Sequence, residues 1–595
     1  MTDLLTMIQG YNMFTCKSLS EVVDYIETEI DNATYLNYLN GTQWVAISSQ
    51  EFVHTVRALA SSFEAKGVKQ GTSVAIISDS SPFWLMVDYA LQCIGAVSVP
   101  IFANISSHNL SYELSDAEIE YAYIASQEKF DQLAPFVGEM KLVLVRDIIA
   151  EGDNIRLWDS FISENISYAK PDIDENDLAT IIYTSGSTGV PKGVELSHRN
   201  LIAQIMDTRL CFEMKGEYKV LSFLPLAHIF ERMVMSFYLS AGVSIYFADD
   251  VKNVGNLLKE VKPAVMTVVP RLLEKIYTKM HENAASAKGI KWLIAKAAFY
   301  RANQKDPNSK DECFIDRLFA RLVYSKLVDA LGGDLKYLIT GGAPLSMPVY
   351  RFFHNVGIPL YQGYGLTETS PVISVNTPNA NKVGTCGKPY AHVEVKLAED
   401  SELLTRGECV MLGYHKQQSK SKETIDTDGW LHTGDLAKID DEGYITLLSR
   451  KKELFKTSNG KYVSAIAIEQ KITANKWIDY AVVIAENRPF VSALIFMDEV
   501  LLEAFAERKK LGEISFEDLV YNRQIQGIVM NLIKKANHKL NHWEQIQKYH
   551  IVSEKVSIES GILTPSMKIS RQKAEELYAA EIEDFYSTNE AKDIS

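Results

Sequence analysis

The sequence has 595 residues, of which 47% are hydrophobic and 23% are charged, and its formal net charge at pH 7 is −15. This length is sufficient for about three to five domains or subdomains with a large core. The acidic balance argues against a nucleic-acid-binding protein, which needs a dominant basic face to displace phosphate counterions. It also argues against attraction of the whole surface to anionic lipid, but not against contact through a local basic patch.

The N-terminal stretch and the cysteines indicate the cellular compartment in which the protein resides. Residues 1–14 lack the basic region and the long apolar region of a signal peptide. No apolar run in the sequence is long enough to span a bilayer. The six cysteines are scattered singly, without a CxxC pair or zinc-ligand spacing to histidine, which is typical of reduced thiols. We therefore expect a cytoplasmic protein that contacts the inner face of a membrane at most peripherally.

Apolar runs alternate with helical patterns through the first 450 residues. Residues 73–78 form a short buried-strand run, 82–94 is typical of a helix, and 96–100 is another strand run. Similar strand runs recur at 220–224, 243–247, 264–269 and 335–339. Strand, helix and strand at this spacing predict βαβ units, and therefore an α/β fold built on mostly parallel sheets.

Two changes of pattern interrupt this alternation. The region at about 281–330 is helical in pattern, and its lysines and arginines outnumber its acids. Near residue 450 a charged cluster precedes a smaller region rich in charged helices. We therefore predict a large domain, 1–449, that contains a basic helical insert, and a small α+β domain, 450–595. The insert, with Trp292 and several phenylalanines, is either a membrane-surface element or a solvated helical hairpin packed on the body.

The segment 181–194 is the most informative in the chain. An apolar strand runs into a series of hydroxyl residues and glycines that ends at a lysine. Glycines let the backbone present N–H groups to an anion, hydroxyls add donors, and Lys192 supplies the counter-charge. The candidate phosphate-binding residues are Thr184, Ser185, Gly186, Ser187, Thr188, Gly189 and Lys192. Gly193 follows Lys192, so this is not a Walker A motif, in which serine or threonine follows the lysine. The alternative is a flexible surface turn.

Four further motifs occur in order with this one. They are YQGYGLTET at 361–369, WLHTGD at 430–435, SRKKE at 449–453 and GILTPSMK at 561–568. With TSGSTGVPKGV they resemble the signatures of the adenylate-forming superfamily over nearly the whole chain, from about residue 74 to 571. The resemblance implies a large domain of mostly parallel sheets layered with helices, a β-subdomain, and a mobile C-terminal domain.

The resemblance also implies a reaction in two steps. ATP and a carboxylic acid form an acyl-AMP with release of pyrophosphate, and the acyl group then passes to coenzyme A. By the same resemblance, the loop from Thr184 to Lys192 holds the β- and γ-phosphates, and Thr184 and Glu368 are the candidate Mg²⁺ ligands, as suits a hard cation. Thr367 donates to the α-phosphate, and Tyr364 stacks on adenine.

The motifs after residue 430 supply the remaining candidates. Asp435 accepts the ribose hydroxyls, and Arg450 adds a ribose contact at the interdomain hinge. Lys568 bridges the carboxylate and the α-phosphate, a role that suits a compact point charge. In the second step the small domain rotates and brings in the loop that contains Gly460, past which the pantetheine arm of CoA runs.

Two motifs favour a long-chain fatty acid as the substrate. LPLAHIFER at 224–232 and VPRLLEKIY at 269–277 resemble the long-chain synthetase subgroup. By this resemblance His228 lines the acyl site, and Gly342 lies where small side chains make room for the chain. No physical role for residues 269–277 follows from their sequence.

Several rival functions share these motifs. A fatty acyl-AMP ligase would perform the same adenylation but load an acyl carrier protein instead of CoA. A peptide-synthetase adenylation domain and a luciferase-like oxygenase share the fold. A non-catalytic protein that binds acyl chains or nucleotide would have lost Glu368 or Lys568, and both are present.

Overall fold

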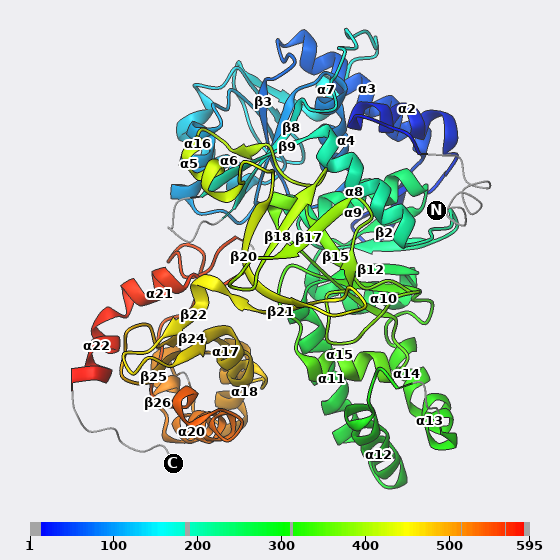
Figure 1. Ribbon diagram of the computed structural model, residues 1–595. Coiled ribbons are helices and arrows are strands. Elements are labelled where there is room, and N and C mark those ends of the chain that lie inside the picture. The colour runs from blue at the N-terminus through cyan, green and yellow to red at the C-terminus, as the bar shows by residue number, and fades with distance from the viewer. Residues whose placement is uncertain (1–13, 185–190, 310–312, 513, 566, 588–595) are drawn as a thin grey trace.

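The computed structural model describes residues 14–184, 191–309, 313–512, 514–565 and 567–587. Figure 1 shows a large body of sheets and helices, and a smaller body formed by the C-terminal part of the chain. At one end of the large body the helices α12 (Ile290–Gln304) and α13 (Phe314–Phe319) extend away from the sheets. The predicted α/β fold class is confirmed.

An eight-stranded sheet carries the candidate phosphate-binding segment near one edge. Strands β3 to β8 pair in parallel, whereas β8 and β9 form an antiparallel hairpin to which β19 is added. The strand order is β19 (Gly413–Tyr414), β9 (Lys192–Ser197), β8 (Leu178–Thr184), β4 (Val97–Ile101), β3 (Ser73–Ile77), β5 (Tyr121–Ile124), β6 (Leu142–Val145) and β7 (Ile155–Leu157).

A nine-stranded sheet forms the second large layer. Its central strands are parallel, and the last strands at each edge are antiparallel. The order is β16 (Lys388–Pro389), β15 (Val372–Val375), β14 (Leu360–Gly365), β13 (Tyr337–Thr340), β12 (Val265–Val268), β10 (Lys219–Ser222), β11 (Ser244–Phe247), β1 (Leu36–Asn40) and β2 (Gln43–Ile47). The six predicted strand runs correspond to β3, β4, β10, β11, β12 and β13, with ends that differ by at most two residues.

Buried helices join the two sheets into one core. All residues of α4 (Pro82–Cys93) are buried, and α9 (Ile229–Ala241) is nearly so. Ser81 caps α4, and Pro82 occupies its first turn, where a missing N–H costs nothing. The guanidinium of Arg232 on α9 donates two hydrogen bonds of 2.8 Å to the Asp88 carboxylate on α4. Because both side chains are 2% exposed, removing either partner would leave a buried charge uncompensated.

The remaining helices of the large body pack around the sheets and form the insert. They are α2 (Leu19–Glu29), α3 (Ser49–Ala65), α5 (Ser107–Asp116), α6 (Gln127–Val137), α7 (Trp158–Phe161), α8 (His198–Cys211), η2 (Val251–Asn253), α10 (Val254–Val261), α11 (Pro270–Ser286), η3 (Ala320–Tyr324), α14 (Ser325–Asp329), α15 (Met347–Asn355) and α16 (Gln418–Thr424). The element η3 is a π-helical turn between α13 and α14.

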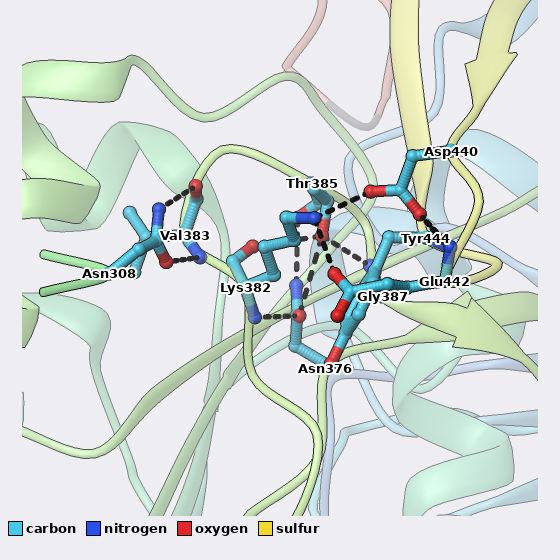
Figure 2. Close-up of polar contacts among 9 residues, drawn as sticks. All are labelled: Asn308, Asn376, Lys382, Val383, Thr385, Gly387, Asp440, Glu442 and Tyr444. Carbon is cyan, nitrogen blue, oxygen red and sulfur yellow. Dashed lines mark hydrogen bonds and ion pairs between the residues drawn. The ribbon is translucent and has the colours of Figure 1, made fainter. Parts of the chain in front are cut away.

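A four-stranded antiparallel sheet forms a β-subdomain between the two bodies. Its strands are β17 (Val393–Leu397), β18 (Glu402–Gly407), β20 (Leu431–Ile439) and β21 (Ile445–Arg450). Figure 2 shows how the β20–β21 turn is anchored: the Lys382 ammonium lies 2.7 Å from both the Asp440 and Glu442 carboxylates. The loop that carries Lys382 is held in turn by Asn376, and Asn308 binds the backbone of its neighbour Val383.

The small body comprises two sheets and surrounding helices. The hairpin of β22 (Leu454–Lys456) and β23 (Tyr462–Ser464) leads into a three-stranded sheet of β24 (Ile478–Ile484), β25 (Val491–Met497) and β26 (Ile546–Ile551). Its helices are η5 (Lys451–Glu453), α17 (Ala465–Thr473), α18 (Glu499–Lys509), α19 (Phe516–Val520), α20 (Arg523–Asn537), η6 (His542–Glu544), α21 (Arg571–Leu577) and α22 (Ala579–Ser587). Within the described ranges, no helix combines the length and the apolar character that crossing a bilayer requires.

Candidate active site

The turn after β14 places Thr367 and Glu368 just beyond the end of a parallel strand. The strand runs into the short helix η4 (Thr367–Thr369) through Gly365. A Cβ at Gly365 would lie 1.8 Å from the carbonyl oxygen of Pro371, so only glycine fits this close backbone approach. The Leu366 N–H donates to the same carbonyl at 3.0 Å. The turn is therefore fixed by backbone packing, and both candidate side chains project from it.

A buried carboxylate links the β-subdomain to β14. Asp435 on β20 pairs in register with Arg450 on β21, and its Oδ1 accepts a 3.1 Å hydrogen bond from the Arg450 Nε. Its Oδ2 accepts a 2.7 Å hydrogen bond from the Tyr364 hydroxyl. Burial and the Asp435 carboxylate raise the pKa of Tyr364 well above its usual value, so the phenol remains a donor. Each carboxylate oxygen keeps a lone pair for a ligand.

Glu368 and Lys192 both lie next to Tyr414. The Tyr414 hydroxyl donates to Glu368 Oε1 at 2.8 Å, and the Lys192 ammonium lies 4.9 Å from the centre of the Tyr414 ring. Lys192 is paired in register with Thr184 at the end of the β8–β9 hairpin. Thr184, Lys192 and Glu368 thus belong to one region. The candidates Ser185, Gly186, Ser187, Thr188 and Gly189 lie outside the described residues.

Further positive charge gathers near Lys192. Burial lowers the pKa of Lys192, and the nearby Lys420 and Lys452 lower it further, while Glu368 acts in the opposite direction. Lys420 lies on α16 and Lys452 on η5 in the hinge motif. An anion placed among these ammonium groups would relieve their mutual repulsion.

Lys568 is the residue of the small body whose charge acts on the region around Asp435. Burial lowers its pKa, the charge of Arg450 lowers it further, and Asp435 acts in the opposite direction. The Lys568 charge in turn helps burial to lower the pKa of His228 to about 4. The Lys568 amine therefore lies within electrostatic reach of Asp435, Arg450 and His228, while the residue as a whole keeps exposed surface.

His228 lies at the start of α9 and is neutral at pH 7. Its Nδ1 accepts a 3.2 Å hydrogen bond from the Phe230 N–H, which caps the helix. The Phe230 ring lies 3.8 Å from where a Cβ on Gly341 would be. The next residue, Gly342, is exposed, has a φ of +77°, and leaves open space on its Cβ side. The region beyond the C-terminal end of β13 therefore combines an aromatic ring with small residues.

Gly460 is separate from these groups in the orientation seen here. It lies in the exposed turn between β22 and β23 with a φ of +75°, and a Cβ added to it would meet no heavy atom within 4 Å. The residues beside it contact the small body: Asn459 donates to the Pro489 carbonyl, and the Lys461 ammonium lies over the Trp543 ring. Across the described ranges, no contact joins Gly460 to Tyr364, Asp435 or Glu368.

Some residues of the region were not predicted from the sequence. Tyr414 holds the Glu368 carboxylate but belongs to none of the motifs, and Lys420 lies on an ordinary-looking charged helix. Asn104 donates a 3.0 Å hydrogen bond to the carbonyl of Pro565, just before the Lys568 loop. Lys452 lies within the SRKKE motif, which is the signal that could have identified it.

Family models match both bodies of the chain. The model described as AMP-binding enzyme covers residues 28–415. The chain belongs to the AMP-binding enzyme family. A second model, AMP-binding enzyme C-terminal domain, covers residues 453–590.

Curated AMP-binding enzymes resemble this chain along nearly its whole length. It is 33% identical to long-chain-fatty-acid–CoA ligase FadD15 of Mycobacterium bovis over 95% of this chain and 96% of the relative. It is 27% identical to long-chain-fatty-acid–CoA ligase 1 of Homo sapiens over 91% of this chain and 82% of the relative. The sequence-based identification as an adenylate-forming enzyme of this kind is confirmed.

Solved structures of the family share the fold. The adenylation domain of a carboxylate reductase from Mycobacterium chelonae superposes with a TM-score of 0.78 at 19% identity, covering 97% of this chain and 92% of that domain. The anthranilate CoA ligase AuaEII in complex with anthranoyl-AMP superposes with a TM-score of 0.70 at 18% identity, covering 95% and 98%. At these identities the likeness establishes the fold alone.

Proposed function

We propose that this chain is an AMP-forming long-chain fatty-acid–CoA ligase. It uses ATP to convert the acid to acyl-AMP with release of pyrophosphate, and then transfers the acyl group to coenzyme A with release of AMP. The observation that carries this proposal is the position of the Lys568 loop: Asn104 of the large body donates to the Pro565 carbonyl of that loop, and the Lys568 charge acts on Asp435, Arg450 and His228. Family membership and the relatives' names as long-chain-fatty-acid–CoA ligases support the reaction and the acid.

Adenylation requires two anions to approach, because the carboxylate oxygen attacks the α-phosphorus of ATP. Lys568 places a positive charge where both anions would meet, and Thr367 adds a hydroxyl donor for the α-phosphate. Lys192, supported by Lys420 and Lys452, offsets the charge of the β- and γ-phosphates together with the loop from Thr184 to Gly189. Holding the groups in line supplies the rest of the acceleration.

The nucleoside would be held by the buried carboxylate and its partners. Asp435 has two oxygens for the two ribose hydroxyls, and Arg450 adds a donor beside them. Tyr364, fixed by its hydrogen bond to Asp435, presents its ring to adenine. The same contact that orders the tyrosine therefore also orders the ribose acceptor.

The donor set near Glu368 fits magnesium. Within the described ranges, no cluster of three or more acidic, histidine or cysteine side chains could hold a metal ion alone. Mg²⁺ is usually bound through one or two carboxylates, waters and substrate phosphates, so a single glutamate beside the phosphate region is suitable. We infer that Glu368, with Thr184, would hold Mg²⁺, which neutralises phosphate charge when bound.

We assign thioester formation to a second orientation of the small domain. In the orientation described here Lys568 lies in the site and Gly460 lies outside it. Rotation about a hinge at Arg450, between a large domain of 1–449 and a small domain of 450–595, would exchange them. The space beside Gly460 suits the pantetheine arm, and His228, Phe230 and Gly342 would border the acyl chain.

The first test is AMP production from ATP, Mg²⁺ and a series of short to long fatty acids, with and without CoA. We expect turnover to require CoA and to peak with long chains, because the acyl-AMP is released or consumed slowly without a thiol acceptor. Acyl-AMP formation without stimulation by CoA would instead indicate a fatty acyl-AMP ligase that loads a carrier protein. Binding of ATP or acid without any acyl-AMP would indicate a non-catalytic binding protein.

We also propose that this cytoplasmic ligase contacts the inner face of the membrane through its insert. One face of α12 packs through Ala298, Phe299 and Ala302, while apolar side chains on its other face are exposed. The exposed apolar residues of α12 and α13 include Ile290, Leu293, Tyr300, Phe314 and Leu318. Exposed Lys291 and Lys296 adjoin them, within a helix that carries no acid. Apolar and basic residues together suit an anionic bilayer surface, in which a long-chain acid would also partition.

The replacement of Leu293 and Tyr300 with glutamate should weaken binding to phosphatidylglycerol-containing vesicles about tenfold, since it removes apolar contact and adds negative charge. Vesicle co-sedimentation measures this, with Val500→Glu, at an exposed apolar site on the small domain, as the control. Equal binding of the variant and the wild type would favour the solvated-hairpin interpretation of the insert.

A further inference from the structure

The helix α11 begins within the segment 269–277, whose role the sequence alone does not explain. Pro270 occupies its first turn directly after β12, and Leu273 and Met280 face the core of the large domain. Two of its charged residues, Arg271 and Glu282, instead lie at the surface toward the small domain. They are separated by 11 positions, or roughly 16 Å along the helix.

Both charged residues form ion pairs with the small domain. Arg271 pairs with Asp479 on β24. Glu282 accepts a 2.6 Å hydrogen bond from the Lys476 ammonium, shortly before the same strand. The two pairs have opposite polarity along α11: the large domain supplies the cation in one pair and the anion in the other. Docking in the opposite direction would place like charges together, so the two pairs select one orientation.

A short chain of contacts connects Arg271 to the Lys568 loop. The Arg271 guanidinium lies 6.0 Å from the centre of the Tyr480 ring, next to Asp479. The Tyr480 hydroxyl donates to the carbonyl of Met567 at 3.4 Å, and Met567 has a left-handed φ of +59°. Asn104 of the large domain binds the Pro565 carbonyl of the same loop. Besides the hydrogen bonds within the loop itself, the backbone around Lys568 is thus contacted by Tyr480 of the small domain and by Asn104 of the large domain.

We propose that α11 is a docking surface that holds the small domain in the adenylating orientation. The positioning residues are then Arg271, Asp479, Glu282 and Lys476. Tyr480 lies between Arg271 and the Lys568 loop, so docking at Arg271 also fixes the position of that loop. This inference rests on the proposed two-step function, because docking is needed for adenylation and must be released for thioester formation.

The ion pairs between the two domains are weak enough for the small domain to undock from α11. The side chains of the Arg271–Asp479 pair are 34% and 30% exposed, and those of the Lys476–Glu282 pair 44% and 43%. Partly exposed ion pairs are weak and screened by salt, so they bias an orientation without locking it. Arg271 also lies 3.7 Å from Glu274 on its own helix, which would keep the guanidinium paired after undocking.

The test is a charge reversal with rescue. Arg271→Asp should lower the rate of acyl-AMP formation about tenfold, whereas thioester formation from supplied acyl-AMP and CoA should stay within about twofold of wild type. Adding Asp479→Arg should restore most of the adenylation rate, because the pair is re-formed with opposite polarity. Arg57→Asp, which breaks two ion pairs between α3 and α2 of the large domain, is the matched control and should change neither rate.

Hydrogen–deuterium exchange gives a readout of docking that does not depend on activity. The peptides 474–482 and 562–570 should exchange faster in the Arg271→Asp variant and return toward wild-type rates in the double variant. Equal loss of both half-reactions, or no recovery on charge swapping, would overturn the docking role. A wild-type protein that forms no acyl-AMP would contradict the proposed function, and the exchange result would still report on docking.

Discussion

Replacing Lys568 with alanine should abolish most acyl-AMP formation, with a loss of about two to three orders of magnitude in rate. The Lys568 charge acts on Asp435, Arg450 and His228, and the two reacting groups that we expect it to bridge are both anionic. Thioester formation from supplied acyl-AMP should remain near wild type, because we assign that step to the other orientation of the small domain.

The two half-reactions are measured separately, by pyrophosphate release in the presence of fatty acid and by acyl-CoA formation from synthetic acyl-AMP. Lys573→Ala is the matched control: it removes a partly exposed lysine on α21, five residues further along the chain. A similar loss in both half-reactions would contradict the assignment of Lys568 to adenylation and would indicate a structural defect.

The pH dependence of adenylation offers a second readout on Lys568. Burial and Arg450 lower its pKa from the ordinary value of 10.5. Since the charged form is needed, kcat/KM should fall as the pH rises through a value below 10.5. Lys568→Arg should keep a weaker activity but lose this alkaline decline, because arginine stays protonated. If the decline persists in that variant, it belongs to Lys192, whose pKa is also lowered.

The sequence was most informative where one strong periodicity or several ordered motifs were present. The strand β3 is a continuous apolar run between Ser73 and Ser78, because both faces of a parallel strand are buried. The motif residues Tyr364, Asp435, Arg450 and Lys568 are far apart in sequence, and their approach in space was predictable only through the family resemblance. Physical reasoning on spacing alone does not bring residues 364 and 568 together.

Other contacts had no local signal at all. Tyr414 reaches Glu368 because the short strand β19 joins the edge of the hairpin that carries Lys192, a pairing set by tertiary packing. Arg271 is one of many helical arginines, and its partner Asp479 lies 208 residues away on another domain. Such pairs depend on how domains dock, which is decided by many weak contacts rather than by local propensity.

Replacing Glu368 with glutamine should lower adenylation by at least about a hundredfold and raise the Mg²⁺ concentration needed for half-maximal rate. The substitution keeps the size of the side chain but removes the negative charge, and a neutral amide oxygen is a weaker ligand for a hard cation. ATP would then approach with its phosphate charge less neutralised, which affects the transition state more than the ground state. Mg²⁺ titrations at fixed ATP measure both effects.

Tyr414→Phe distinguishes the proposed role of Glu368 as a metal ligand from the role of the hydrogen bond that orients its carboxylate. It leaves the Glu368 charge in place but removes the 2.8 Å hydrogen bond to Oε1. We expect a loss of about tenfold, in line with one hydrogen bond to a charged group, and a smaller shift in the Mg²⁺ requirement than in Glu368→Gln. If instead Glu368→Gln adenylates normally and needs no additional Mg²⁺, then Glu368 serves only to order Tyr414 and the neighbouring Lys192. In that case the metal would have to be bound by the nucleotide and Thr184 without a protein carboxylate.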